Sequence, residues 1–233
     1  MNSNQWDTYS KLYNDGIGTE GDKLHKNFID PLIFQFMSDY RNKVVADVGC
    51  GNGYFARKIA IRAKKVFGLD YSAELVKLTK TNTSELTNIE ILFGDVLKRW
   101  PIRSNSCDIV ISNMLLQYLS SLTNFAKEAA RILKKKGILI ITIDSPLHSL
   151  FVRAQELLGK KDKKLIQSGS YFKREKRLKK TLWDKATIEY YNRPLMDYFN
   201  AFTDYFIFEH MDENTEDGEM PRILGLKWCK IKN

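Results

Sequence analysis

The alternation of short apolar runs with helix-like segments between residues 43 and 144 constrains the fold of this chain more than any other feature. Helical periodicity is found at 54–63, 73–81 and 125–133. Strands that alternate with helices form βαβ units, whose right-handed connections build a parallel sheet covered on both faces. The apolar runs that we interpret as strands are 43–48, 66–70, 89–95, 107–113 and 137–144.

Segments with other patterns flank this alternating region. Residues 1–40 are predicted to be helical, because apolar residues from Phe28 to Met37 recur at steps of three and four. Residues 145–200 are basic and aromatic and have no clean period, so no element is predicted there. Two further strands are predicted at 205–209 and 222–229.

A glycine cluster follows the first strand, in the sequence Asp47-Val48-Gly49-Cys50-Gly51-Asn52-Gly53. Ligands of open parallel sheets bind beyond the carboxyl ends of the strands, where glycine lets the backbone approach closely. Asp70 and Asp95 end the next two strands, so we expect two acids beside the glycines in a pocket suited to adenosine.

The spacing of the glycines excludes two phosphate-binding motifs. A dinucleotide fingerprint has G-x-G-x-x-G, whereas the third position here is Tyr54 and the pattern is G-x-G-x-G. No Lys-Ser/Thr pair follows the cluster, so it is not a P-loop. An acid at Asp47 would repel a pyrophosphate and suits a cationic ligand, such as a sulfonium with an ammonium group.

Taken together, these segments resemble class I S-adenosylmethionine (SAM)-dependent methyltransferases, and more loosely their small-molecule, type 11-like branch. The resemblance covers roughly residues 40–145. The segments that carry it are 47–53 (motif I), 66–72 (the second-strand motif), 93–96 (the third-strand motif), 107–113 (motif IV) and 133–138 (the turn before strand five).

The resemblance implies a doubly wound, seven-stranded Rossmann-like α/β sheet in the order 3-2-1-4-5-7-6, with an antiparallel last strand and a helical or inserted cap. It divides the chain into a helical cap at 1–40, a SAM-binding core at 41–144, a basic insertion or substrate cap at 145–200, and C-terminal strands at 201–233. The implied cofactor is SAM, with S-adenosylhomocysteine (SAH) as product.

The resemblance also implies roles for individual residues. The three glycines shape the loop around the methionine part of SAM, and Asp47 supports the loop near the ammonium. Asp70 holds the ribose, Asp95 and Val96 hold the adenine, and the Asn113 backbone lies near the ammonium. The full predicted cofactor set is Asp47, Gly49, Cys50, Gly51, Asn52, Gly53, Asp70, Tyr71, Ser72, Asp95, Val96 and Asn113, with no metal ligand.

The methyl acceptor is less well defined by the sequence. Many relatives have a histidine after strand four, whereas this chain has Gln117, which is no base at neutral pH. Our first candidate for a general base is therefore His148, and Tyr13 is the second. Further candidates are His25, Tyr118 and Tyr191.

Two other features concern the acceptor and the cap. An Asn-Pro-Pro-Tyr-type tetrapeptide, typical of family members that methylate planar amino groups, is absent after strand four. We therefore expect a small-molecule acceptor, methylated at oxygen or nitrogen. Trp6, Tyr9 and Tyr13 are three and four residues apart, so a helix would present them together as a lid over SAM.

Most of the net charge of +9 lies in one segment, residues 160–180, which contains ten basic and two acidic residues. Such a segment is typical of a solvated insertion, and it could also cover the active site or track a phosphate backbone. A methyltransferase directed at RNA or protein is therefore the alternative function, and a non-catalytic SAM- or SAH-binding protein is a second alternative.

The sequence also indicates where such a protein would work. The longest apolar runs are too short to span a bilayer, and the N-terminal residues have no signal-peptide pattern. The three cysteines are odd in number and widely spaced, which favours neither disulfides nor a metal site. We expect a cytoplasmic protein, monomeric or homodimeric, without membrane partners.

Overall fold

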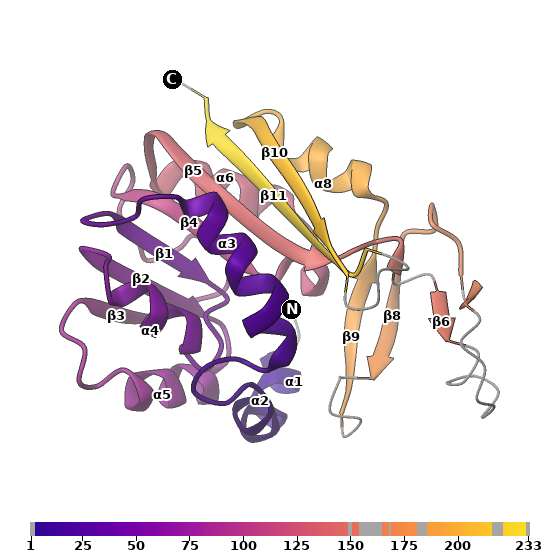
Figure 1. Ribbon diagram of the computed structural model, residues 1–233, viewed down its shortest axis with the longest axis horizontal. Helices are drawn as coiled ribbons and strands as arrows, with labels where there is room; N and C mark the ends of the chain where they lie inside the picture. Colours follow the sequence, from indigo (N-terminus) through magenta and orange to yellow (C-terminus); the bar gives the residue numbers. More distant parts are fainter. Residues whose placement is uncertain are drawn as a thin grey trace.

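The computed structural model describes residues 3–148, 151–153, 165–167, 169–180, 186–215 and 221–231. Its centre is a seven-stranded sheet in the order β3-β2-β1-β4-β5-β11-β10 (Figure 1). Strands β1 to β5 run parallel, and β11 is antiparallel to both of its neighbours. The predicted fold class and strand order are therefore confirmed. The strands are β1 (Val44–Val48), β2 (Lys65–Asp70), β3 (Ile89–Phe93), β4 (Cys107–Asn113), β5 (Leu133–Asp144), β10 (Phe206–Asn214) and β11 (Ile223–Lys230).

Helices cover both faces of this sheet. Strand residues alternate between two apolar clusters: Val45 packs with η1, α3 and α4, whereas Ala46 and Val48 pack with α6 and α8. This period of two is what a strand buried on both faces requires. The helices are α1 (Ser3–Thr8), α2 (Ser10–Ile17), the π-helical η1 (His25–Ile29), α3 (Asp30–Met37), α4 (Tyr54–Ala60), α5 (Ala73–Asn82), the 3₁₀ turn η2 (Leu116–Tyr118), α6 (Thr123–Ile132) and α8 (Leu195–Phe202).

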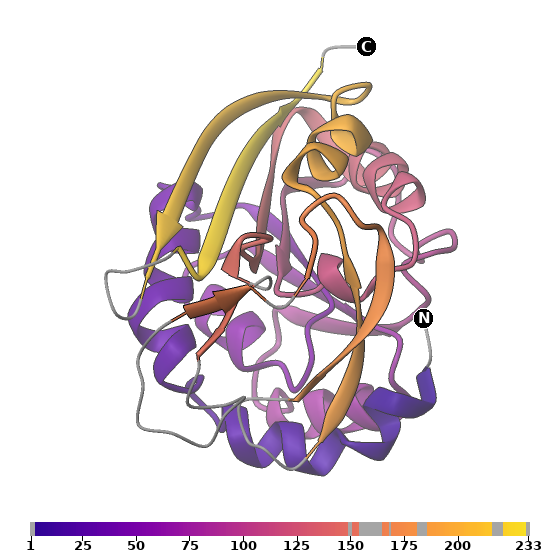
Figure 2. The same ribbon diagram turned by 90° about the vertical axis from the view of Figure 1, so that its right-hand side faces the viewer.

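The N-terminal region is helical, as predicted. Pro31 is the second residue of α3, directly after the π-helical η1, and it has no N–H to donate to that preceding turn. Helices α1 and α2 lie at the same end of the molecule as the start of β9, a strand of the hairpin described below (Figure 2). None of the helices in the described part of the chain has the length and apolar content needed to cross a bilayer.

The lysine-rich segment predicted as the turn before strand five lies within the range of β5. Helix α6 ends at Ile132 and β5 begins at Leu133, which pairs with Cys107. The next registered pair is Ile109 with Ile138, so the lysine-rich stretch is a bulge at the start of the strand. Lys136 within it has a φ of 60°, a left-handed conformation typical of turns.

A two-stranded hairpin lies in the segment for which no element was predicted. It consists of β8 (Glu175–Lys180) and β9 (Thr187–Asn192), paired antiparallel. Burial in β8 alternates as in a normal strand, but charged residues on both faces hide that period in the sequence. A second short pair joins β6 (Phe151–Arg153) and β7 (Leu165–Gln167). Residues 160–164 of the basic segment lie outside the described residues.

Candidate functional site

The glycine loop after β1 has the conformation that its sequence predicts. Gly49, Gly51 and Gly53 have φ angles of 81°, 57° and 77°, in the left-handed region that favours glycine. The Gly51 N–H donates to Asp70 Oδ2 at 2.9 Å, and Thr79 Oγ1 donates to the Gly51 carbonyl at 2.6 Å. The loop is thus fixed to the end of β2 and to α5.

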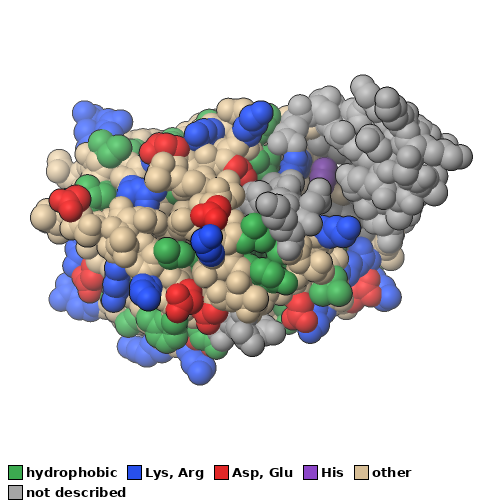
Figure 3. Space-filling view, turned by 90° about the horizontal axis from the view of Figure 1, so that it is seen from below, with side chains coloured by type: hydrophobic (Ala, Val, Ile, Leu, Met, Phe, Trp, Pro, Cys, Tyr) green, Lys and Arg blue, Asp and Glu red, His purple; other side chains and the backbone are tan. Residues whose placement is uncertain are grey.

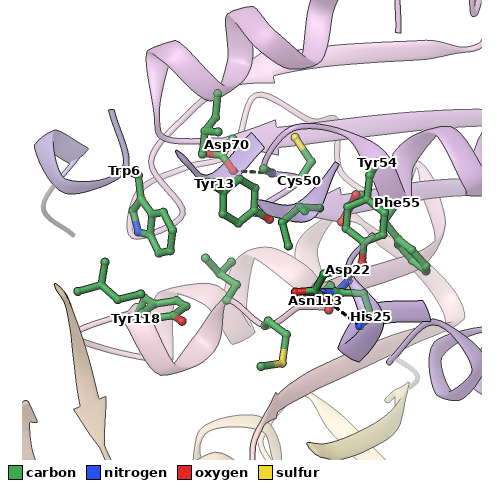
Figure 4. A pocket seen from close by; sticks show the side chains of 18 of the residues that line it. Trp6, Tyr13, Asp22, His25, Cys50, Tyr54, Phe55, Asp70, Asn113 and Tyr118 are labelled. Atoms are coloured by element: carbon green, nitrogen blue, oxygen red, sulfur yellow. Dashed lines mark hydrogen bonds and ion pairs between the residues drawn. The ribbon is translucent and has the colours of Figure 1, made fainter. Parts of the chain in front are cut away.

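A cavity of about 140 Å³ lies beside this loop, at the carboxyl ends of β1, β2 and β4 (Figure 4). The structure brings most of the predicted site residues to it. Those that line it are Tyr13, Asp47, Gly49, Cys50, Gly51, Asp70, Tyr71, Val96 and Asn113. The predicted residues that are not among its lining are Asn52, Gly53, Ser72, Asp95 and His148.

Two carboxyl groups form the floor of the cavity. The Asp47 side chain is 1% exposed, and neither of its oxygens has a hydrogen-bond partner among the described residues. Burial, with Asp70 and Asp30 nearby, raises the pKa of Asp47 to about 7. Burial also raises the pKa of Asp70 to about 6, although hydrogen bonds from the Ser72 and Gly51 backbone oppose it.

This floor fits the cofactor implied by the glycine loop. A buried carboxylate without a partner is costly, and a cationic ligand would remove that cost. SAM carries a sulfonium and an ammonium, so Asp47 and Asp70 have the charge that SAM requires. A Cβ on Gly51 would lie 2.6 Å from the Tyr13 hydroxyl, so glycine at this position leaves room for the Tyr13 side chain against the loop.

Aromatic residues of α1, α2 and η2 line one side of the cavity. The Trp6 ring meets those of Tyr13 and Tyr118 edge to face, with centroids 5.8 and 5.1 Å apart (Figure 4). Tyr9 separates α1 from α2 and is not among the lining residues. Burial, with Asp70 and Asp47 nearby, raises the pKa of Tyr13 far above its usual value. That shift keeps the phenol protonated and disfavours Tyr13 as a general base.

The opposite side of the cavity holds an imidazole and a carboxylate in contact. Nδ1 of His25 lies 2.8 Å from Oδ1 of Asp22, and both residues line the cavity (Figure 4). Burial favours a higher pKa for Asp22, but hydrogen bonds from the His25 side chain and backbone lower it below its usual value. A carboxylate at Nδ1 orients an imidazole so that Nε2 can accept a proton.

Polar side chains link the ends of β4 and β5 to α4 and α3. Thr142 Oγ1 donates to Asn113 Oδ1 at 3.0 Å, and Asn113 Nδ2 donates to the Tyr54 hydroxyl at 2.9 Å. The Tyr54 hydroxyl donates to Asp30, which is paired with Lys58. The Asn113 side chain therefore uses its oxygen and its amide nitrogen for one hydrogen bond each in this network.

Three predicted residues outside the lining hold the site in place. Asn52 Nδ2 donates to Asn14 Oδ1 and to the Gly18 carbonyl, at 3.1 and 3.0 Å, which ties the glycine loop to α2. Ser72 is the N-cap of α5, and its hydroxyl donates to Asp7 of α1 at 2.6 Å. Asp95 Oδ1 accepts the Leu97 N–H at 2.9 Å.

The structure also adds lining residues that the sequence analysis did not assign to the site. Lys179 and Ile188 come from the β8–β9 hairpin and Arg222 from the start of β11. Lys179 was one lysine within a basic run, and Arg222 had no motif around it. Only the aromatic spacing at the N-terminus pointed to Trp6.

Comparisons with known proteins agree with this geometry. Residues 46–141 match a family model described as a methyltransferase domain. A malonyl-[acyl-carrier protein] O-methyltransferase of Halalkalibacterium halodurans is 25% identical over 126 residues, which are 50% of this chain and 46% of that protein. The chain spans about half or less of the length of the curated relatives that it matches.

Solved structures share the fold. A SAM-dependent methyltransferase from Mesorhizobium loti superposes with a TM-score of 0.71 at 19% identity, covering 86% of this chain and 96% of that one. The N-methyltransferase NodS of Bradyrhizobium japonicum, solved with SAH, superposes with a TM-score of 0.62 at 13% identity, covering 97% and 100%. Residues 46–141 thus match a methyltransferase domain, and the chain shares the fold of these solved methyltransferases.

Proposed function

We propose that this protein transfers the methyl group of SAM to an oxygen or nitrogen of a small molecule. The observation that carries the proposal is the cavity floor, where two acids, one of them without a hydrogen-bond partner among the described residues, lie against a loop of three left-handed glycines. Asp70 would hold the ribose, Val96 the adenine, and Asp47 would face the ammonium. The family match supports the same assignment.

The enclosure of the cavity supports a small acceptor. Trp6 and Tyr13 of the N-terminal helices and Lys179 and Ile188 of the β8–β9 hairpin line it together with core residues. We therefore propose that residues 1–40 and part of 145–200 act as the two halves of a cap. Such a cap excludes water and fixes the acceptor in line with the methyl group.

The described part of the basic segment argues against a nucleic-acid acceptor. Of the six basic residues between Lys173 and Lys180, five form ion pairs with carboxylates of the same chain. Charges that are already paired offer little to a phosphate backbone. On the described part of the face shown in Figure 3, basic side chains are interspersed with acidic ones.

Methyl transfer from SAM requires mainly that the protein position the acceptor correctly. The sulfonium of SAM is an activated methyl donor, so alignment of the acceptor can supply much of the rate enhancement. Where the acceptor needs to lose a proton, the His25–Asp22 pair, which lines the cavity, is better placed than His148 to act as general base. His148, the first candidate from the sequence, is not among the lining residues.

The cellular setting is also a proposal. All three cysteines are free thiols, which favours a reducing compartment such as the cytoplasm.

Two measurements test the proposed function. Calorimetric titration of the protein with SAH should show stoichiometric binding, and incubation with methyl-labelled SAM and a small-molecule extract should yield labelled product. Turnover of a small acceptor should change little between 50 and 200 mM salt, whereas an RNA-directed activity would fall steeply. SAH binding without transfer to any acceptor would instead support the non-catalytic alternative.

A further inference from the structure

Among the described residues, His25 is the histidine that lines the cavity. It is the first residue of the π-helical η1 and is 9% exposed. His210 lies on β10, where its ring meets that of Phe36 edge to face, and His148 is not among the lining residues. π-Helical turns are rare and are found frequently at functional sites. The imidazole that can exchange a proton with a bound acceptor is therefore that of His25.

Asp22 holds this imidazole through one carboxylate oxygen (Figure 4). Oδ1 of Asp22 lies 2.8 Å from Nδ1 of His25 and also accepts the His25 N–H at 3.0 Å. Burial raises the pKa of Asp22, but hydrogen bonds from His25 outweigh it and bring that pKa below its usual value. An ionised carboxylate only accepts hydrogen bonds, so in the neutral imidazole the proton lies on Nδ1. In the described part of the chain, no hydrogen bond of His25 uses Nε2, which leaves that nitrogen to a ligand.

A second set of charged groups near His25 is paired internally. The His25 ring meets that of Tyr54 edge to face, with centroids 5.3 Å apart. The Tyr54 hydroxyl donates to Asp30 at 3.1 Å, and Asp30 pairs with Lys58 at 2.8 Å. Burial raises the pKa of Asp30, and its contacts with Lys58 and Tyr54 and the charge of His25 oppose that rise. Among the described residues, Asp22 is thus the carboxylate in direct contact with the imidazole.

Several other side chains of the cavity lining keep their protons at neutral pH. Burial raises the pKa of the Tyr54 and Tyr118 phenols above the usual value, as it does for Tyr13. Lys179 forms an ion pair with Asp144, which favours its charged form. These groups are therefore unsuited to take a proton from an acceptor, and the two acids at the glycine loop are assigned to the cofactor.

We propose that His25, positioned by Asp22, is the general base of methyl transfer, and that the acceptor is a group that must lose a proton at neutral pH, a hydroxyl or an ammonium. This inference rests on the proposed methyltransferase function and specifies a catalytic residue and the class of its substrate. A carboxylate acceptor is already ionised at neutral pH and would need no such pair.

The transfer step balances with these groups. Nε2 of His25 takes one proton from the hydroxyl or ammonium, which frees an electron pair on the oxygen or nitrogen. That electron pair forms the bond to the methyl carbon, while the C–S bond breaks with its electrons on sulfur and SAH is formed. Asp22 stabilises the resulting imidazolium by its charge, and solvent then removes the proton.

The first test concerns the product and needs no identified acceptor. The protein is incubated with methyl-labelled SAM and a small-molecule extract, and the labelled product is treated with mild alkali. A methyl ester formed on a carboxylate releases its label as volatile methanol, whereas a methyl ether or an N-methyl group retains it. We expect the label to be stable to alkali. Hydriodic acid, under conditions that cleave only methyl ethers, then distinguishes an oxygen acceptor from a nitrogen acceptor.

Variants of the histidines test the base. His25→Gln should lower turnover about a hundredfold, within the range of about 10²–10⁴ that a general base contributes, with SAH affinity unchanged within twofold. Wild-type turnover should rise with pH in the range in which an imidazole ordinarily titrates, about pH 5 to 8, and this rise should be absent in His25→Gln. His210→Gln is the matched control, because its imidazole lies on β10 against Phe36, and it should leave turnover and its pH profile unchanged.

A variant of Asp22 separates the positioning of His25 from helix capping. Asp22 is also the N-cap of the helical segment that begins at residue 23, since its carbonyl accepts the Lys26 N–H at 2.9 Å. Asparagine caps a helix about as well as aspartate, so Asp22→Asn should melt near the wild-type temperature. Its turnover should nevertheless fall at least tenfold, because the imidazolium loses the neighbouring charge. The chain has three histidines, so NMR of ¹⁵N-labelled histidine can verify the Nδ1–H tautomer of His25 in the SAH-loaded protein.

The outcomes distinguish this inference from the proposed function. A label released by alkali would overturn the substrate class. Unchanged turnover in His25→Gln or Asp22→Asn, or an equal loss in His210→Gln, would overturn the role of the pair, and a tenfold loss of SAH affinity in His25→Gln would place the imidazole in the cofactor site instead. Failure of the wild-type protein to bind SAH or to transfer any label would overturn the proposed function itself, and both are measured before any variant is compared.

Discussion

Asp70 combines two tasks in one carboxylate. Its oxygens accept the N–H groups of Gly51 and Ser72, both at 2.9 Å, so it holds the glycine loop against the start of α5. A carboxylate accepts up to about four hydrogen bonds, which leaves capacity for ribose hydroxyls. The same residue therefore shapes the pocket and is expected to bind the ligand.

Replacing Asp70 by alanine tests that second task. Asp70→Ala should weaken SAH binding at least tenfold, about 1.4 kcal/mol or more, because both ribose contacts are lost. Calorimetric titration gives the affinity, and a melting curve shows how much stability the two backbone contacts contributed. Unchanged affinity in a folded variant would remove Asp70 from the ligand site.

Asp47 should make stability depend on pH. Its pKa of about 7 in the folded chain exceeds the value near 3.9 expected when unfolded, so the folded state binds the proton more tightly. This contribution to stability is largest below about pH 4 and is lost as the pH rises to about 7. Asp70, with a folded pKa of about 6, acts in the same direction.

The variant Asp47→Asn removes one of these two titrations. Its free energy of unfolding, measured by denaturant titration, should exceed that of the wild type by a larger margin at pH 8 than at pH 5, where Asp47 is mostly protonated. The difference between the two margins is at most about 3 kcal/mol, since each pKa unit corresponds to about 1.4 kcal/mol. SAM affinity should fall at the same time, and equal margins at both pH values would contradict the prediction.

At the scale of the elements, the glycine loop packs against the N-terminal helices. A Cβ on Gly51 would lie 2.6 Å from the Tyr13 hydroxyl, and Gly51 has a φ of 57°. A side chain at position 51 would therefore be strained by the left-handed backbone and would also overlap Tyr13. The backbone constraint comes from the turn after β1, and the steric constraint comes from Tyr13 in α2.

A matched pair of alanine variants separates strain from contact. Gly51→Ala should lower stability by more than the roughly 1 kcal/mol of strain expected at a left-handed position, and it should weaken SAH binding at least tenfold. Gly18 has a φ of 66° with no atom within 4 Å of its Cβ position. Gly18→Ala should thus show the strain alone, with SAH affinity retained. Denaturant titration and calorimetry measure both, and identical effects of the two variants would refute the role of the Tyr13 contact.

At the scale of the whole molecule, one short helix connects three separate parts. Gln5 Oε1 accepts the Glu189 N–H of β9 at 2.8 Å, Trp6 lines the cavity, and Asp7 accepts the Ser72 hydroxyl. These consecutive residues of α1 bridge the hairpin, the cavity and the start of α5. Ligand binding should therefore order α1 and the hairpin together.

Hydrogen exchange with and without SAH measures this coupling. The cofactor must enter and leave beneath the cap, so exchange of residues 5–20 and 187–192 should slow in parallel when SAH binds. The variant Asp7→Ala removes the acceptor for Ser72, and in it the slowing of residues 5–20 should decrease at equal SAH saturation. Exchange that is equally slow with and without SAH would exclude a mobile cap.

The sequence by itself determined the central sheet and the acid-glycine motif. Both depend on neighbours in the chain: strand period and helix period differ, glycines mark the left-handed turn, and acids at strand ends share one edge of a parallel sheet. The parallel strands β1 to β5 and the left-handed glycine loop accordingly agree with the predictions, and the seven-stranded order agrees with what the resemblance implies.

Only the tertiary structure decided which distant groups face the same cavity. The β8–β9 hairpin has no apolar period, because its charged residues are paired across the hairpin and with other elements, so its strands were not predicted. Arg222 and Lys179 meet at the cavity because β11 inserts beside β5 and the hairpin folds over its end. His148 is close to the site in sequence and not among its lining residues, whereas His25 lines it from another helix. Such placements depend on long-range packing, which local residue patterns do not encode.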